Sequence, residues 1–555
     1  MSQPRSAEFS LLQAIQSPSF TPRQRDAAAL WQLLLDGADL GLVVLALTRL
    51  GPTGAAAGLS RIQAEQGASR ALLVRALGRL GAAVSSAEIR QALHQLLDDP
   101  DAKVSRYAAI ALGKLPHSSQ TEELLLMQLQ RAANPQAQRV LAEALGKVGS
   151  EAALRTMAQL HQSSEASSSA PLLTQTVQRA ELRLQRSLLR AQSLPGEQAI
   201  DVEAQFPGPT QVTLRCRSGL ASILVDELLA ARLLRHRHEA HVEDAGQLGQ
   251  PGRVTLTVTG PLSQLFAART FVDWILPLPL DPVSSLAALP QQVALALSSE
   301  KTQALLQALS VSPLRYRIEL SGAGHRRALV WQLAQEIGHR CPYLLNDPKD
   351  SPWELLIDDS ALKVGGAVRL ALRPRQLPDP RFGYRVGDVP AASHPTLAAA
   401  LAKVAAVAPG EVVWDPFVGS GSELIETARL QPQARLYGSD LDAAALQTAA
   451  ENAQAAGVKL ALRAGDAQTY WPAGTRVVLT NPPMGGRVSR GQVTDLLTRF
   501  AHHVGQRLPE GGRLVWLNPQ PRRHGPLLQQ AGLSLRVAHS VDMNGFWAQL
   551  EVWQR

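Results

Sequence analysis

The chain has 555 residues, 45% of them hydrophobic and 18% charged, which predicts three or four folded domains and excludes a disordered chain. Its two cysteines, Cys216 and Cys341, exclude a disulfide framework or a cysteine metal site, and no apolar run is long enough to span a membrane. The formal net charge of +8 suits a polyanionic partner, and with no signal-peptide pattern the expected location is cytoplasmic.

A short motif recurs four times in the N-terminal region. ALTRLG from Ala46 returns as ALGRLG from Ala76, ALGKLP from Ala111 and ALGKVG from Ala144, at spacings of 30, 35 and 33 residues. This period, with apolar residues at helical spacing, is typical of stacked helix pairs. We predict a HEAT-like α-solenoid over residues 1–165, with a plain helical bundle as the alternative. Such repeats would offer a surface for a protein partner.

Residues 166–197 are predicted to be a linker and a helix. The stretch 163–171 is rich in serine, and apolar residues recur at helical spacing over 172–193 before Pro195-Gly196 ends the pattern. A change from helical to mixed patterning follows, so we place a domain boundary here.

Residues 198–375 predict an α+β region. Residues 253–258 and 314–320 alternate between apolar and polar like strands, and further strands are expected near 353–357 and 368–372. A helix is predicted from about residue 326 to 339. The mixture of elements distinguishes this region from the all-helical part before it.

Arginines in this region are candidate RNA contacts. Arg315 and Arg317 share one face of a predicted strand, and Arg326 and Arg327 stand where a helix begins, so that charge and free N–H groups coincide. Arg381 belongs to a basic and aromatic segment, 374–389, of a kind that can grip single-stranded RNA. The alternatives are a solvated arginine face and an ordinary tether.

The C-terminal region, 376–555, carries four polar strand tips in order. An apolar run ends at Asp415 and is followed by a glycine-rich turn; the next strand ends at Asp440, where a carboxylate typically binds ribose hydroxyls. A third strand ends at Asp466-Ala467 and a fourth, 477–480, runs into Asn481-Pro482-Pro483-Met484. This order predicts a Rossmann-like α/β domain that binds a dinucleotide or S-adenosylmethionine (SAM).

The Asn481–Met484 tetrad favours SAM over a dinucleotide. The lone pair of a base amino group becomes nucleophilic only when the nitrogen turns towards sp³, and two acceptors aimed at its N–H bonds favour that change. The side-chain oxygen of Asn481 and the carbonyl of Pro482 would supply them. The two prolines fix φ and offer no N–H, so the loop presents carbonyls in a rigid frame.

These motifs resemble those of THUMP-containing RNA methyltransferases that modify guanine N2. Members carry sequences close to DPFCGSGT and NPPYGxR, matched here by residues 415–422 and 481–487, and a segment before the first strand, matched by 393–398. The resemblance begins near residue 200 and is strong from 380 onwards. Ser422 replaces the usual threonine, and Met484 replaces an aromatic residue that stacks on the flipped-out base.

The resemblance implies a multidomain fold: an N-terminal α-solenoid added here to a central THUMP and ferredoxin-like α+β region and a C-terminal class I methyltransferase domain. The expected SAM contacts are Thr396, Asp415, Pro416, Phe417, Gly419, Gly421, Asp440, Leu441, Asp466, Ala467 and Asn481. The expected catalytic residues are Asn481, Pro482, Pro483 and Met484. The expected RNA contacts are Arg315, Arg317, Arg326, Arg327, Arg381 and Arg487.

The resulting hypothesis is a SAM-dependent methyltransferase of guanine N2, in tRNA or in rRNA, with tRNA favoured. Cytosine-C5 methylation needs a cysteine in the catalytic domain, and both cysteines precede residue 380. No metal site is expected, because His502 and His503 are adjacent and would point in different directions on a helix. The alternatives are an adenine-N6 or cytosine-N4 methyltransferase of DNA or RNA, and a non-catalytic RNA-binding or assembly protein.

Overall fold

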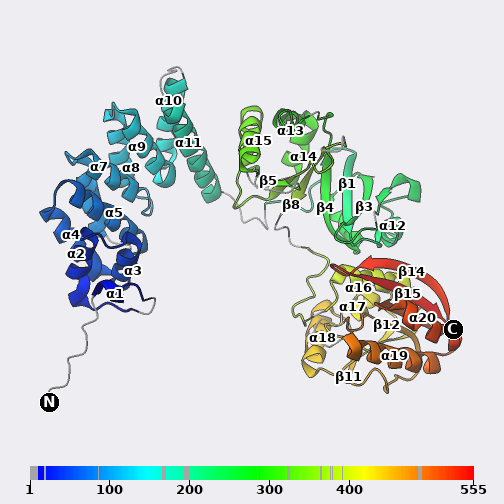
Figure 1. Ribbon diagram of the computed structural model, residues 1–555. Helices are drawn as coiled ribbons and strands as arrows, with labels where there is room; N and C mark the ends of the chain where they lie inside the picture. The colour runs from blue at the N-terminus through cyan, green and yellow to red at the C-terminus, as the bar shows by residue number, and fades with distance from the viewer. Residues whose placement is uncertain are drawn as a thin grey trace, which may run out of the picture. The chain divides into compact units, whose positions relative to one another are not determined.

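The computed structural model forms two compact units, residues 1–193 and 194–555 (Figure 1). It describes the chain apart from residues 1–10, 18–19, 85–86, 166–170, 193–198, 245, 284, 312, 322–325, 363–365, 376, 378, 391 and 485–489. None of the described helices is long and apolar enough to cross a membrane.

The first unit is helical, as predicted. Its helices are α1 (Leu11–Ala14), α2 (Ala27–Leu35), α3 (Leu40–Leu50), α4 (Pro52–Ala64), α5 (Gly67–Ala83), α6 (Ala87–Gln95), α7 (Ala102–Leu112), α8 (Ser119–Arg131), α9 (Pro135–Val148), α10 (Glu151–Glu165) and α11 (Pro171–Gln192). Side-chain oxygens of Asp39, Asp101 and Asn134 accept backbone N–H groups at the starts of α3, α7 and α9. Helix α11, which the sequence placed with a linker, packs against α9 and α10 within this unit.

Close glycine-on-alanine contacts explain the repeated motif. A Cβ added at Gly78 would lie 2.3 Å from the Cβ of Ala111, and one added at Gly113 would lie 2.9 Å from the Cα of Ala144. A third contact is equally close: a Cβ added at Gly146 would lie 2.8 Å from the Cα of Ala180. Helices α5, α7, α9 and α11 therefore pack directly against one another in succession (Figure 1). The HEAT-like assignment itself remains a prediction.

The second unit begins with an eight-stranded sheet in the order β2-β3-β1-β4-β8-β7-β5-β6. Its elements are β1 (Thr210–Cys216), α12 (Ala221–Ala230), β2 (His241–Glu243), β3 (Gly252–Val258), β4 (Phe271–Leu278), α13 (Leu289–Ser298), α14 (Glu300–Leu309), β5 (Arg315–Leu320), α15 (Arg327–Arg340), β6 (Leu345–Asn346), β7 (Trp353–Asp358) and β8 (Arg369–Pro374). The strands and the helix expected in this region are present. Its assignment as a THUMP region remains a prediction.

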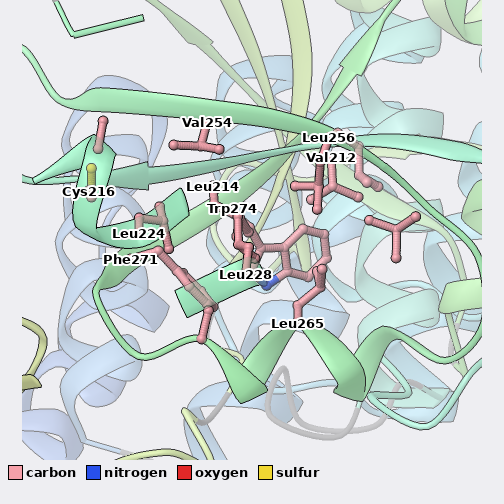
Figure 2. Packing of buried hydrophobic residues seen from close by; sticks show 14 of the residues in the cluster. Val212, Leu214, Cys216, Leu224, Leu228, Val254, Leu256, Leu265, Phe271 and Trp274 are labelled. Atoms are coloured by element: carbon pink, nitrogen blue, oxygen red, sulfur yellow. The ribbon is translucent and has the colours of Figure 1, made fainter. Parts of the chain in front are cut away.

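Alternating residues of β1 and β3 build the core of this part. Val212 and Leu214 face Val254 and Leu256, and the indole of Trp274 from β4 fills the space beside them (Figure 2). Cys216 lies at the end of the same apolar row. Burial raises the pKa of its thiol far above the ordinary value, so this cysteine is a packing residue and not a nucleophile.

The C-terminal domain is a seven-stranded sheet in the order β11-β10-β9-β12-β13-β15-β14. Its elements are α16 (Pro395–Ala405), β9 (Val412–Asp415), α17 (Ser422–Leu430), β10 (Arg435–Asp440), α18 (Ala443–Ala456), β11 (Ala461–Ala464), β12 (Thr475–Thr480), α19 (Arg490–Arg507), β13 (Arg513–Asn518), α20 (Pro521–Gln530), β14 (Ser534–Asp542) and β15 (Trp547–Gln554). β9 to β13 pair in parallel, whereas β15 is antiparallel to both β13 and β14.

The strand order reverses between β9 and β12. From β9 the chain moves outward to β10 and β11, and then returns to place β12 on the other side of β9. The carboxyl ends of β9 and β12 are thus neighbours at a topological switch point, where open α/β sheets bind their ligands. This geometry brings the predicted tips at Asp415 and Asn481 together.

A buried ion pair joins the two sheets of the second unit. Arg269, just before β4, donates from Nε to Glu426 Oε2 at 2.6 Å and from Nη2 to Oε1 at 2.9 Å. Glu426, on α17, also accepts from the hydroxyl of Tyr384 at 2.8 Å and is 1% exposed. Because the Glu426 carboxylate accepts hydrogen bonds from both Arg269 and Tyr384, it fixes α17 against the part of the chain that carries the eight-stranded sheet.

We expect Glu426→Gln to lower the free energy of unfolding of the second unit by about 2–3 kcal/mol, because it leaves the Arg269 charge uncompensated. Calorimetry of the full chain measures this as a lower transition temperature for that unit. The control is Glu510→Gln, which removes the same charge from an exposed position of the same domain. Equal transition temperatures for the two variants would contradict the assignment.

Candidate active site

The glycine-rich turn after β9 is shaped by two left-handed residues. Gly419 has φ +49° and Gly421 has φ +81°, and a Cβ at Gly421 would lie 3.2 Å from the Cβ of Ala449 in α18. The backbone N–H of Gly419 donates to Asp440 Oδ2 at 3.1 Å. The turn is therefore tied to the tip of β10, as the sequence motif predicts for a nucleotide-binding loop.

Asp415 is a buried carboxylate with one unpaired oxygen. Its Oδ1 accepts from Thr480 Oγ1 at 2.6 Å and from the N–H of Phe417 at 3.1 Å, whereas its buried Oδ2 has no hydrogen-bond partner in the described part of the chain. Burial, followed by the like charge of Glu423, raises the pKa of Asp415 well above its usual value. No lysine or arginine among the described residues forms an ion pair with this carboxyl.

Asn481 is held by a relay that starts at Glu423. The Ser393 hydroxyl donates to Glu423 Oε1, and the Asn481 side-chain Nδ2 donates to Ser393 Oγ at 2.7 Å. The buried Asn481 Oδ1 then has no hydrogen-bond partner among the described residues. The relay fixes the amide so that its nitrogen is occupied and its oxygen remains free to accept a hydrogen bond.

The remaining residues of the tetrad lie in different environments. Pro482 is buried and Pro483 is exposed. Met484 is half-buried and packs against the main apolar core, which favours a supporting role for it over contact with a base. The next residues of the motif, including Arg487, lie outside the described residues.

The tips of β10 and β11 supply polar and apolar groups. Asp440 Oδ1 accepts from the N–H of Asp442 at 3.0 Å, and the adjacent Leu441 leaves 76% of its surface exposed. This pair of side chains suits a nucleoside, because a base can pack against the leucine while the ribose hydroxyls bind the carboxylate. Asp466 Oδ1 accepts from the N–H of Gln468 at 2.9 Å, and Ala467 is buried.

Three further predicted cofactor residues are packed into the domain. Pro416 is buried, and the half-buried Phe417 meets Phe500 edge-on at 5.3 Å between ring centroids. Thr396 is fully buried in the first turn of α16, and its hydroxyl lies 2.8 Å from Nδ1 of His394. Their position around the β9 tip is consistent with the prediction that they shape the cofactor site.

Asn452 and Ser393 are site residues that sequence reasoning missed. The Asn452 side chain, on α18, donates to the carbonyls of Ser420 at 2.9 Å and Gly387 at 3.0 Å, and thereby clamps the glycine-rich loop. No local pattern marks Asn452. Ser393 belongs to the segment 393–398 noted for its resemblance, and its position there was the available signal.

Two of the predicted RNA contacts are wrong. Arg315 is fully buried and donates from Nη1 to Asp350 at 2.9 Å, so its charge is neutralised inside the protein. Arg381 is 4% exposed, donates to the Asp379 carboxylate and lies 3.6 Å from the centroid of the Phe271 ring. Both arginines stabilise the fold, and neither presents its guanidinium to a phosphate.

Three other arginines of that set, Arg317, Arg326 and Arg327, are more accessible. Arg317 is half-exposed and pairs with glutamates on its own strand and on β7. Arg326 pairs with Asp359, whereas Arg327 is exposed at the first residue of α15. Their role as RNA contacts remains a prediction.

The C-terminal domain has a Rossmann-like fold, with polar groups gathered at the switch point of its sheet. The family described as "RMKL-like, methyltransferase domain" matches residues 382–549. Over 252 residues the chain is 30% identical to tRNA (guanine(6)-N2)-methyltransferase of Thermus thermophilus, covering 43% of this chain and 72% of that protein. The chain therefore belongs to this family of methyltransferases.

The chain is also similar to two other proteins. The chain is 34% identical over 151 residues to release factor glutamine methyltransferase of Bordetella pertussis, covering 23% of this chain and 55% of that protein. The crystal structure of TrmN from Thermus thermophilus superposes with a TM-score of 0.49 and 24% identity, covering 62% of this chain and 99% of that one.

We expect Asp415→Asn to stabilise the cofactor-free protein at neutral pH. The raised pKa means that folding disfavours the ionised carboxyl, so the wild type loses stability as pH rises from about 4 through the raised value, whereas asparagine does not ionise. The melting temperature of the variant should exceed that of the wild type by about 3 °C or more at pH 7.5, the shift that ~1 kcal/mol causes in a domain of this size.

Melting curves between pH 4 and pH 8 check this expectation, with Asp495→Asn, at an exposed position of α19, as the control. The gap between Asp415→Asn and wild type should close towards pH 4. A gap of the same size at every pH would show that ionisation of Asp415 is not its cause.

Proposed function

We propose that this protein transfers a methyl group from SAM to the exocyclic amine of a base in RNA, guanine N2 in tRNA. The observation that carries the proposal is the free, oriented side-chain oxygen of Asn481 at the β12 tip. It lies at the switch point of the sheet, next to a glycine-rich turn and an unpaired buried carboxylate. A hydrogen-bond acceptor for the substrate amine and a site for a cationic cofactor are thus adjacent.

The residues present fit SAM. Asp415, with its unpaired Oδ2, would receive the ammonium of the methionine end, and the backbone around Gly419 and Gly421 would lie along it. Asp440 would bind the ribose hydroxyls, Leu441 would cover one face of the adenine, and Asp466 with Ala467 would meet its edge. Bound there, SAM supplies an electrophilic methyl group on a sulfonium.

The tetrad would act on the amine as charge develops. The two N–H bonds would point at Asn481 Oδ1 and at the carbonyl of Pro482, which turns the nitrogen lone pair towards the methyl carbon. As the nitrogen–carbon bond forms, the sulfur–carbon bond breaks and sulfur keeps the electron pair. The methylated nitrogen is acidic and loses its proton to water, so the site needs no strong base.

The choice of guanine N2 in tRNA rests on the relative that is 30% identical and on the resemblance of the sequence motifs. The region 198–375, whose sheet is fixed against the catalytic domain through Arg269 and Glu426, would hold the RNA. Arg317, Arg326 and Arg327 are its proposed phosphate contacts, and Arg487 of the catalytic domain is a further one. Adenine N6 and cytosine N4 are the alternative amines, and nucleoside mass spectrometry distinguishes them.

We expect Asn481→Ala to reduce single-turnover methyl transfer about 10²–10³-fold, the scale for losing one group that stabilises developing charge. SAM affinity should change less than about twofold, because the amide acts only in the transition state. The assay is mass spectrometry of nucleosides from tRNA incubated with enzyme and SAM, and calorimetry provides the affinity. Near-normal transfer by this variant would refute amine activation by the tetrad.

Ser393 is proposed as a positioning residue, because it touches Asn481 and not the substrate. Ser393→Ala should lower kcat about tenfold while the KM for RNA and the SAM affinity stay within about twofold, because the Asn481 amide can then rotate. Ser393→Thr keeps the hydroxyl and should restore at least half of the lost rate. If kcat and the melting temperature decrease by the same amounts in both variants, the hydroxyl contributes to packing and does not orient the amide.

A further inference from the structure

The four helices that pack in succession in the first unit are strongly basic. Helices α5, α7, α9 and α11 contain eleven lysines and arginines, and their two acidic residues are Glu143 and Glu181. Glu181 faces His161. The helices between them, α6, α8 and α10, contain three arginines and five glutamates. Among these seven helices, net positive charge is thus concentrated in α5, α7, α9 and α11.

The repeat places one cation within or just beyond each of these helices. Gly78, Gly113 and Gly146 pack on alanines of the next helix, and the residue after each glycine is Arg79, Lys114 or Lys147. Lys114 and Lys147 follow the contacted alanines Ala111 and Ala144 by three residues. In α11 the contacted alanine is Ala180, and the residue three further on is Arg183. We call Arg79, Lys114, Lys147 and Arg183 the basic ladder.

The basic ladder is exposed and unneutralised. All four side chains are exposed, and none forms an ion pair with a residue that the structure describes. Besides partial burial, the neighbouring charges of Arg79, Lys147 and Arg75 lower the pKa of Lys114. Axes of helices in such close contact lie ~8–10 Å apart, which is about one Debye length, so neighbouring cations of the ladder repel one another.

We propose that the basic ladder binds the phosphate backbone of RNA. A backbone that runs across the stacked helices presents negative charge along its whole length, and binding would relieve the repulsion and release counterions. A protein partner fits less well, because Leu172 provides the one exposed large apolar side chain among the described residues of these four helices. The choice of RNA over another polyanion rests on the proposed function.

The test compares two full-length triple variants that lose the same charge from the same unit. One is Arg79→Gln/Lys114→Gln/Lys147→Gln, on the ladder. The control is Arg25→Gln/Arg131→Gln/Arg155→Gln, at exposed positions on other elements. Fluorescence anisotropy with an unmodified tRNA transcript, without SAM and at several KCl concentrations, provides Kd and its salt dependence.

The ladder variant should bind at least tenfold more weakly at 0.15 M KCl, and the slope of log K against log [KCl] should decrease by about 2–3, as for the loss of three phosphate contacts. The control should stay within about twofold of wild type. A further variant, Lys114→Arg/Lys147→Arg, keeps the charge and should keep the affinity. Melting curves identify any ladder variant that is misfolded, in which case single substitutions to glutamine are compared.

Equal affinity and equal salt slope for the ladder and control variants would overturn the proposal, whatever else the ladder binds. A methyl-transfer assay run in parallel separates this outcome from failure of the proposed function. Loss of RNA affinity on the ladder in a protein that transfers no methyl group would support the ladder and refute the enzyme assignment. Methyl transfer by a protein whose tRNA affinity does not depend on the ladder would support the enzyme assignment and refute the ladder proposal.

Discussion

Two carboxyl groups buried side by side, Asp415 and Glu423, set the geometry of the catalytic domain. Neither forms an ion pair with a described residue: Asp415 accepts from the Thr480 hydroxyl, and Glu423 accepts from the Ser393 hydroxyl and interacts with the charge of Arg385. Those hydroxyls belong to the tip of β12 and to the segment before α16. The repulsion between the two carboxyl groups is therefore offset only when these two segments meet the region from β9 to α17. The arrangement costs stability, and Asp415 Oδ2 and Asn481 Oδ1 have no hydrogen-bond partner among the described residues. Strain of this kind is common where a protein is organised for a charged ligand.

Helix α17 connects this arrangement to the sheet that precedes the catalytic domain. Glu423 turns into the site, while Glu426, one turn later, receives the guanidinium of Arg269 and the hydroxyl of Tyr384. The desolvation of the carboxylate is offset for Glu426 by a direct ion pair, and for Glu423 by the Ser393 hydroxyl, its own backbone N–H and the charge of Arg385. One helix therefore carries a carboxylate that fixes the two sheets together and a second one whose pKa is raised by burial.

The extent to which the sequence predicts this structure follows the range of the interactions involved. The strand tips at Asp415, Asp440 and Asn481 were predictable because strand, turn and helix are local patterns whose order determines the topology. Arg315 was misread because alternation gives the face of a strand but not what covers it, and its partner Asp350 lies 35 residues away. Ser393 acts on a residue 88 positions further on, a contact that exists only after folding. Asn452 clamps two loops for the same reason.

The repeat motif of the first unit shows how one sequence pattern can impose two physical properties. Glycine at the third position of ALGKL removes the Cβ that would keep neighbouring helices apart, and the next residue is then forced to the surface beside the same contact. Close packing and charge alignment are thus inseparable: the shorter the distance between the helices, the stronger the repulsion between their cations. Helices α6, α8 and α10, in contrast, carry mixed charges. Retention of a cation at each step instead costs free energy in the isolated protein, and a bound polyanion is the kind of ligand that offsets it.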